Sequence, residues 1–461
     1  MAPDHDEPLS LPPEEVRRLG YRVVDMVVDH LAGLRDLPPV VVGERAALEA
    51  RLREPLPEAP GDLDEALDLA AGVVLRNMQH GDHPRFFARV PSPSSPVGML
   101  GDALASGMNA IATSWVGSTG PTVLELVVLD WLAEMLGMPA GTEGILLSGG
   151  SASSLTALAA ARAARLGGHD PDAVVYCSDQ THASITRALR ILGFAPDRVR
   201  LLPTGSGFRL VPGAVAGAIA ADRSAGLRPF CLIATAGTTN TGTVDPLAAL
   251  ADLAAAEGLW LHVDGAYGAP AALTEQGRAL LDGMERADSL AADPHKWLFA
   301  PYEVGALLVR EPGALAAAFA MEPEYLRDTT GEVNFRDRGP QLTRATRALK
   351  LWLTIKAFGV DAIRDAVARG IALAERAEAA LRATPGWEIV TPAQLAVVTF
   401  AHERAGAVDI AARAVADGYA VPTSTVLRGR PVLRLCTINP RTTDEEIDAT
   451  VARLTELAER A

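Results

Sequence analysis

Residues 144–166, "GILLSGGSASSLTALAAARAARL", join a short apolar run to two glycines and a long alanine-rich segment. The apolar run has the length of a buried strand, and the alanine-rich segment has the composition of a helix. The same alternation returns in "DAVVYCSD" (172–179) before "HASITRALRIL" (182–192), and in "PFCLIATAG" (229–237) before "DPLAALADLAAAEG" (245–258). Strands that alternate with helices predict an α/β fold around a mainly parallel sheet.

The segments on either side of this region follow other patterns. Residues 10–35 and 62–78 have apolar residues at helical spacing, and a proline-rich connector separates them. Toward the C-terminus the pattern predicts a helical tract at 356–384 and strands near 387–401 and 431–438. A last helix is predicted from residue 442 onward. The predicted units are an N-terminal helical segment (1–85), a large α/β domain (86–355) and a small α+β domain (356–461).

Composition narrows the class of protein. The chain has 461 residues, and its 57 acidic residues exceed its 42 Lys and Arg, which gives a formal net charge of −15. Binding to nucleic acid or to an anionic membrane needs a basic face, so we expect neither partner. The three scattered cysteines, the acidic start "MAPDHDEPLS" and the lack of a run of 18 apolar residues predict a cytoplasmic globular protein.

Polar residues follow several of the predicted strands, where open parallel sheets bind their ligands. After "GILL", Gly149 and Gly150 allow a tight turn, and Ser151 opens a helix. Free amides at a helix N-terminus suit a phosphate, although an ordinary serine-capped helix has the same sequence. A nucleophile elbow is a poor match, because "GGSAS" lacks the last glycine of G-x-S-x-G.

Two further strand ends carry candidate residues. "LWLHVDGAYG" delivers Asp264 after an apolar run, followed by Gly265 and Ala266, which leave room for a flat ligand. Taken alone, Asp264 could serve a metal ion, act as a general base or form a turn. Thr239, after "CLIATAG", reads by itself as part of a polar turn.

The segment "AADPHKWLFAPYEVG" (291–305) places Lys296 among apolar neighbours. A desolvated ammonium either finds a partner or loses its proton. We therefore interpret Lys296 as a residue whose amine forms a Schiff base with an aldehyde cofactor, and we expect desolvation to lower its pKa. The alternative is a surface lysine whose stem lies beside Trp297.

Together these strand ends fit one cofactor, pyridoxal 5'-phosphate. The phosphate needs amides, the ring nitrogen needs a carboxylate, and the aldehyde needs an amine. No metal site is predicted.

Six motifs resemble the group II pyridoxal-phosphate decarboxylases, especially those that act on aromatic amino acids. They are "HPRFFARVPSPSSP", "GILLSGGSASSLTALAAAR", "SDQTHASITRA", "LHVDGAYG", "DPHKWLFAPYEVG" and "RALKLW". The resemblance runs from about Pro12 to the C-terminus. It implies a fold-type-I enzyme with a mainly parallel seven-stranded sheet flanked by helices. It also implies a homodimer in which the N-terminal helices wrap the partner, and an L-amino acid substrate that is decarboxylated to an amine.

The resemblance assigns roles to individual residues. It implies that Lys296 bonds to the cofactor, that Asp264 pairs with the ring nitrogen, and that His182 stacks on the ring and helps to bind the substrate. His295 is expected beside the bond to Lys296. The remaining implied contacts are to the phosphate (Ala152, Ser153 and, nearby, Thr239) and to the substrate carboxylate (Arg434).

Two departures from the family pattern concern the cofactor and the substrate. Asp293 stands where the family often has Asn. A carboxylate near the phosphate is repulsive unless it turns away or is protonated, so we do not assign Asp293 a contact to the phosphate. The segments that surround an aromatic substrate in the family here carry Arg89, Val90 and Thr113, and Gly81 replaces a tryptophan. These residues are predicted to bind the substrate, with less aromatic stacking.

A third departure concerns the proton that replaces CO2. Counting back from Lys350, the family's catalytic-loop tyrosine falls at Phe335, which cannot donate a proton. Relatives with Phe there oxidise the substrate with O2 and release an aldehyde, so an aldehyde synthase is the alternative function. A shifted register would instead make Tyr325 or His182 the proton donor, and residues 321–340 are expected to form a lid. A cofactor-free binding protein on the same fold is disfavoured, because both Lys296 and Asp264 are present.

Overall fold

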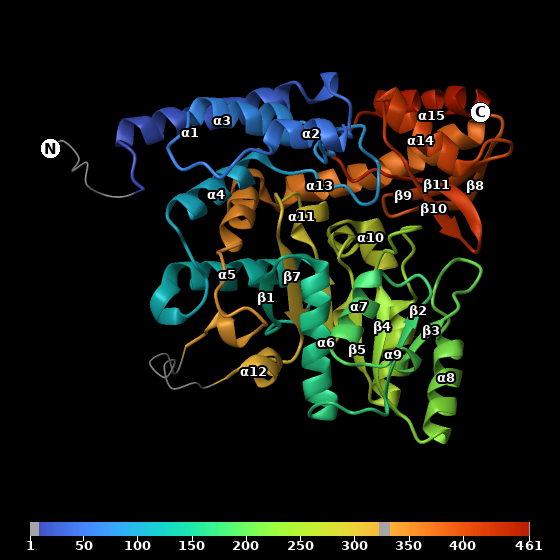
Figure 1. The fold of residues 1–461 in the computed structure, drawn as a ribbon. Coiled ribbons are helices and arrows are strands. Elements are labelled where there is room, and N and C mark those ends of the chain that lie inside the picture. Colours follow the sequence, from blue (N-terminus) through green and yellow to red (C-terminus); the bar gives the residue numbers. More distant parts are fainter. Residues whose placement is uncertain (1–8, 322–331, 461) are drawn as a thin grey trace.

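The computed structural model describes residues 9–321 and 332–460. Its main feature is a seven-stranded sheet with the order β1-β7-β6-β5-β4-β2-β3 (Figure 1). All neighbouring strands pair in parallel except at β7, which is antiparallel to both β1 and β6. The strands are β1 (Glu143–Leu147), β2 (Ala173–Ser178), β3 (Val199–Leu202), β4 (Arg228–Thr235), β5 (Trp260–Asp264), β6 (Ser289–Ala292) and β7 (Gly305–Val309). The predicted fold class is confirmed.

Helices bury the central strands of this sheet. The helix α6 (Gly150–Leu166) packs across β1, β4, β5, β6 and β7, and its buried face includes the small residues Ala157, Ala160 and Ala161. Small side chains let a helix lie close to a sheet, and the strands β5 and β6 are accordingly buried along their whole length. The other helices around the sheet are α4 (Pro96–Gly107), α5 (Trp115–Met135), α7 (Ala183–Ile191), α8 (Pro212–Ser224), α9 (Leu247–Glu257), α10 (Glu275–Leu280), α11 (Pro294–Trp297) and α12 (Ala314–Phe319).

The N-terminal helices lie apart from the sheet, on the same side of it as the small C-terminal sheet (Figure 1). They are α1 (Pro13–Ala32), α2 (Arg45–Leu52) and α3 (Leu63–Leu69), and a π-helical turn at Ala70–Val74 continues α3. The two predicted helices are confirmed. The helix α2 was not predicted, because it lies within the connector, whose prolines are typical of irregular structure. Every residue of α1 remains at least partly exposed, including Val16, Val24 and Val28.

The C-terminal part forms a second, antiparallel sheet with the order β10-β11-β9-β8. Its elements are α13 (Ala348–Ala383), β8 (Trp387–Gln394), β9 (Val397–His402), α14 (Ala407–Asp417), β10 (Thr423–Leu427), β11 (Arg430–Cys436) and α15 (Asp444–Glu459). The strand β10 was not predicted, because its "TSTVL" sequence is half polar. The domain boundaries stay a prediction, since α13 runs across residue 355 and bends further on, at Gly359.

Within the described ranges, no helix is long and apolar enough to cross a membrane. The structural consequence of the sheet order is that β1, β4, β5 and β6 run in the same direction. Their carboxyl ends therefore meet at one edge, which places Ser148, Thr235, Asp264 and Asp293 together.

Candidate active site

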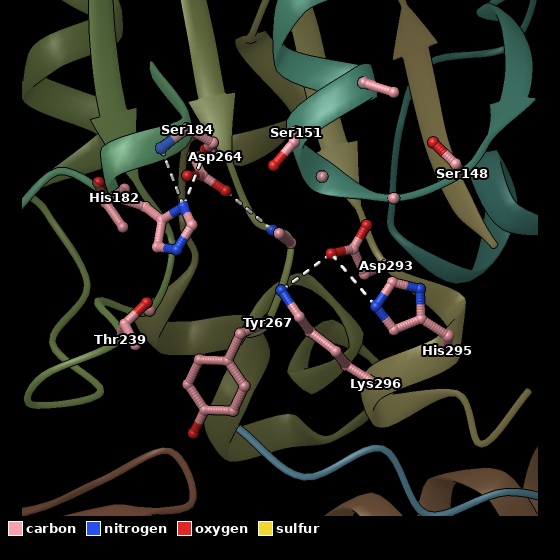
Figure 2. Close-up of a pocket in the computed structure, with 16 residues that line it drawn as sticks. Ser148, Ser151, His182, Ser184, Thr239, Asp264, Tyr267, Asp293, His295 and Lys296 are labelled. Carbon is pink, nitrogen blue, oxygen red and sulfur yellow. Dashed lines mark hydrogen bonds and ion pairs between the residues drawn. The ribbon is translucent and has the colours of Figure 1, made fainter. Parts of the chain in front are cut away.

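A cavity of about 280 Å³ lies at this edge of the large sheet (Figure 2). Lys296 and Asp264 point into it, with His182 on one side and Asp293 and His295 on the other. The complete lining is Ser148, Gly149, Gly150, Ser151, Ala152, His182, Ser184, Thr235, Gly237, Thr239, Asp264, Ala266, Tyr267, Asp293, His295 and Lys296. Five segments that are far apart in the sequence thus supply one site.

Lys296 lies on the short helix α11, directly after β6. Its Nζ is 2.8 Å from Oδ2 of Asp293, which is almost completely buried. Burial lowers the pKa of the Lys296 amine, but Asp293 and, beyond it, Asp264 raise that pKa more, so it stays above its ordinary value. The prediction of a lowered pKa is therefore wrong for the unmodified amine, because it did not take this ion pair into account.

Lys296 differs from the other lysines of the chain. The sequence has three lysines, and the structure describes all of them. Lys350 is buried and pairs with Asp102 at 2.8 Å, and Lys356 is exposed. Lys296 alone lines the cavity, so an aldehyde held there has one amine within reach.

Asp264 is the last residue of β5. It is buried, and its Oδ1 accepts a hydrogen bond from the amide of Ala266 at 3.2 Å. The residues after it are small, as predicted: a Cβ at Gly265 would lie 2.8 Å from the Cβ of Ala269. The carboxylate is thus fixed at the cavity wall opposite the start of α6, where it can face a ring nitrogen.

The start of α6 forms the opposite wall. Gly149 has φ of 154°, and a Cβ there would lie 3.2 Å from the His295 ring, so this close approach requires glycine. Ser151 and Ala152 line the cavity from the first turn. Ser153 lies behind them, and its buried hydroxyl has no hydrogen-bond partner within the described ranges. A helix N-terminus with hydroxyls and close backbone approach suits a phosphate group.

Two histidines and a threonine complete the predicted cofactor contacts. His182 is the N-cap of α7, and its Nδ1 lies 2.8 Å from the Ser184 hydroxyl, which fixes the ring at the cavity. His295 is buried, and its Nδ1 lies 2.7 Å from the Val304 carbonyl oxygen. Burial lowers the pKa of His295, although Asp293 opposes the effect. Thr239 lines the cavity on the side of His182.

Phe335 does not reach the cavity formed by the described residues. It is completely buried in the core of its own chain, on a 3-10 turn (Phe335–Asp337), and the guanidinium of Arg344 lies 5.0 Å from its ring. Its predicted part in the chemistry therefore has no geometric support. Phe335 was assigned to the family's tyrosine position by its distance in sequence from Lys350, and that distance gives no information about burial. Tyr325 and most of the expected lid, 322–331, lie outside the described residues.

The four predicted substrate residues also lie outside the described cavity walls. Arg89 is exposed, Val90 packs against the core, and Thr113 contacts the segment at Arg336 and Arg344. Arg434 is buried and donates a hydrogen bond to the Arg89 carbonyl oxygen. Its Nε and Nη2 find no hydrogen-bond partner among the residues described, and burial lowers its pKa.

The prediction did not include Tyr267, Ser184 and Ser148 as cavity residues. Tyr267 follows Asp264 by three residues and stacks on Trp297, with the ring centroids 5.3 Å apart. Its position in "HVDGAYG" was the available signal. Ser184, two residues after His182, could have been found from the preference of helix N-termini for short polar side chains.

These residues fit pyridoxal phosphate. The cavity offers one amine, a carboxylate at the facing wall and a helix N-terminus with glycine backbone. The Thr235 hydroxyl lines the cavity and has no hydrogen-bond partner among the described residues, so a ligand there could provide one.

Comparisons with known proteins agree. The family model described as "Pyridoxal-dependent decarboxylase conserved domain" matches residues 46–403. An aromatic-L-amino-acid decarboxylase of Bacillus atrophaeus is 45% identical over 98% of this chain and 97% of its own length. A phenylacetaldehyde synthase of Arabidopsis thaliana is 35% identical over 84% of this chain and 82% of its own. The crystal structure of Oryza sativa TDC with PLP and tryptamine has a TM-score of 0.93 and 31% identity, covering 98% of this chain and 99% of that one.

The chain belongs to the pyridoxal-dependent decarboxylase family. It is a pyridoxal-phosphate-dependent amino acid decarboxylase, as the sequence predicted.

Proposed function

We propose that this enzyme decarboxylates an aromatic L-amino acid and releases the amine and CO2. The observation that carries the proposal is the cavity in which Lys296 and Asp264 face one another, in a chain similar over almost its whole length to an aromatic-L-amino-acid decarboxylase. Pyridoxal phosphate, when bound, supplies the electron sink for the pair of electrons that remains at the substrate Cα when CO2 leaves.

The residues of the chain would divide the work as follows. Lys296 binds the cofactor covalently, and Asp264 holds a proton on the ring nitrogen. His182 covers one face of the ring and contacts the substrate. The phosphate would be held at the start of α6 by Ala152 and Ser153, with Thr239 and His295 at the sides of the cavity.

Arg434 is proposed to bind the substrate carboxylate. Its buried guanidinium has two nitrogens without hydrogen-bond partners in the described part of the chain, and such a group is costly unless a ligand pairs with it. Arg89 and Val90 are also proposed to lie near the substrate, because the Arg89 carbonyl oxygen accepts a hydrogen bond from Arg434. Thr113 stays a predicted substrate residue, and its contacts to Arg336 and Arg344 lie outside the described cavity walls.

A homodimer is part of the proposal. Val16, Val24 and Val28 leave an apolar face of α1 exposed. A second cavity, of about 310 Å³ and largely apolar, lies between α1 and the π-helical turn. A second copy of the chain would bury both, and light scattering should give twice the mass of the chain. A cytoplasmic location is proposed from the three free, buried cysteines.

The amine is the proposed product because the argument for an aldehyde depended on Phe335. A ring buried beneath Arg344 lies outside the walls of the described cavity, which gives that argument no support. The proton that Cα needs would come from His182, which faces the cavity, or from Tyr325.

The test is product analysis with a panel of L-amino acids in an oxygen electrode, with Lys296→Ala as the control. We expect one or more aromatic amino acids to give equal amounts of amine and CO2 without oxygen uptake. Aldehyde formed with consumption of O2 would establish the synthase instead, and turnover of only non-aromatic substrates would contradict the proposed specificity.

A further inference from the structure

Asp293 places a buried carboxylate against the start of α6. Its side chain is 2% exposed, and a Cβ built at Gly150, the first residue of α6, would lie 2.9 Å from its Oδ2. The backbone amides that suit a phosphate are therefore the immediate neighbours of a carboxylate. The other oxygen, Oδ1, is buried and has no hydrogen-bond partner in the described part of the chain.

The charge of Asp293 is balanced mainly by Lys296, at 2.8 Å. His295 lies farther away, with Nε2 at 3.8 Å, and burial lowers the pKa of that imidazole, although Asp293 opposes the effect. More distant charged groups affect these two residues. Asp264 and Tyr302 raise the pKa of Lys296, and Lys350 lowers the pKa of His295.

Cofactor binding would add negative charge to this balance. The nitrogen of Lys296 would enter the covalent bond and keep one proton, and a phosphate carrying close to two negative charges would be held at the start of α6. An ionised Asp293 would then face a like charge in a buried site, and like charges disfavour each other's ionised forms. A proton on Asp293 removes the repulsion and gives the unpartnered Oδ1 a hydrogen to donate.

We propose that Asp293 takes up a proton when pyridoxal phosphate binds and then donates a hydrogen bond to the phosphate. The bond to Lys296 releases one water molecule, and the additional proton comes from solvent. Cofactor affinity is therefore linked to pH through a residue at which the family often has Asn. The inference requires the cofactor but is independent of which amino acid is the substrate.

The first test measures the Kd of pyridoxal phosphate for the full chain stripped of cofactor, between pH 7 and 8.5, in wild type and Asp293→Asn. Asn keeps the shape and removes the charge. If the wild type takes up one proton on binding and the variant does not, the ratio of the wild-type Kd to the variant Kd should rise about tenfold per pH unit. At pH 8 the variant should bind at least tenfold more tightly. Equal slopes, or weaker binding by the variant, would overturn the proposal.

Pyridoxal, which lacks the phosphate, is the matched ligand. Removing the Asp293 charge also changes the reactivity of Lys296, and that effect is common to both ligands. The extra slope should therefore appear with pyridoxal phosphate and be absent with pyridoxal. The same slope with both ligands would show that Asp293 acts through Lys296 alone, and the proposal would fail.

A second measurement needs only the wild-type protein, in case the variant does not fold. Calorimetry in buffers of different ionisation enthalpy gives the number of protons bound with the cofactor. We expect about one proton more for pyridoxal phosphate than for pyridoxal at pH 7.5. No difference between the ligands would overturn the proposal, and neither measurement involves substrate turnover.

Discussion

Two buried ion pairs of this enzyme look alike in geometry and differ in use. Lys296 pairs with Asp293 at 2.8 Å beside the cavity, and Arg344 pairs with Glu125 at 2.6 Å beneath Phe335. The Lys296 side chain is 24% exposed, whereas Arg344 and Glu125 are both completely buried. The first pair borders open space, and the second is enclosed by protein.

The enclosed pair ties three segments together. Arg344 donates to the carbonyl oxygens of Ala112 and Leu146, and Glu125 accepts from the Leu146 amide. Burial raises the pKa of Glu125, and the Arg344 charge opposes that rise. Because Leu146 belongs to β1, the pair fixes the strand that leads to Ser148 and Gly149.

The comparison teaches that burial of charge is not itself a sign of chemistry. Each pair includes a buried carboxylate, and each retains atoms without partners among the described residues. What distinguishes the Lys296 pair is a neighbouring volume in which the amine can exchange its partner for a ligand. We therefore expect changes at the cavity to impair function, and changes at the enclosed pair to impair stability.

The largest effect is expected from Asp264→Asn. Loss of the carboxylate removes the charge that keeps the ring nitrogen protonated, and charge stabilisation in a dry site commonly contributes ~3–4 kcal/mol, or about 10²–10³-fold in kcat. Asp222→Asn is the control, since Asp222 is a buried carboxylate that binds Arg200 and Tyr176 away from the cavity. Steady-state kinetics should show the loss only in the first variant, and near-normal turnover by it would assign the role elsewhere.

A smaller but definite effect is expected from Arg344→Leu. The variant leaves Glu125 buried without its cation, which typically costs ~3–5 kcal/mol of stability. Urea unfolding followed by circular dichroism should show a lower midpoint. The double variant with Glu125→Leu should recover much of the loss, because no buried charge then remains. If the single variant keeps its unfolding midpoint but loses turnover, the Arg344–Glu125 pair serves catalysis rather than stability, and the distinction between the two pairs is wrong.

The smallest effect is expected from Phe335→Tyr. A hydroxyl added to this enclosed ring should cost ~1–3 kcal/mol, since it must be desolvated or displace its neighbours. Phe400→Tyr, in the apolar core beside the C-terminal sheet, should behave similarly. Neither change should alter the ratio of amine to aldehyde. A product shift in Phe335→Tyr alone would show that Phe335 reaches the reacting atoms after all.

The same contrast explains which features the sequence could reveal. Asp264 ends the strand β5 and Lys296 lies on the short helix that follows β6, so local pattern and motif sufficed to predict that they meet. The Lys296–Asp293 pair was also within reach, because residues three apart on a helix are neighbours. Arg344 and Glu125 are 219 residues apart, and no local pattern indicates their contact. Phe335 was placed by counting back from Lys350, and such counting carries no information about burial.

The most direct test of the central claim uses the fact that the chain has only three lysines. The holoenzyme should be reduced with borohydride and digested, and the pyridoxyl group located by mass spectrometry. We predict a single adduct on Lys296, absent from Lys296→Ala and unchanged in Lys356→Ala. An adduct on Lys350 or Lys356, or a fully adducted Lys296→Ala protein, would contradict the assignment of this cavity as the active site.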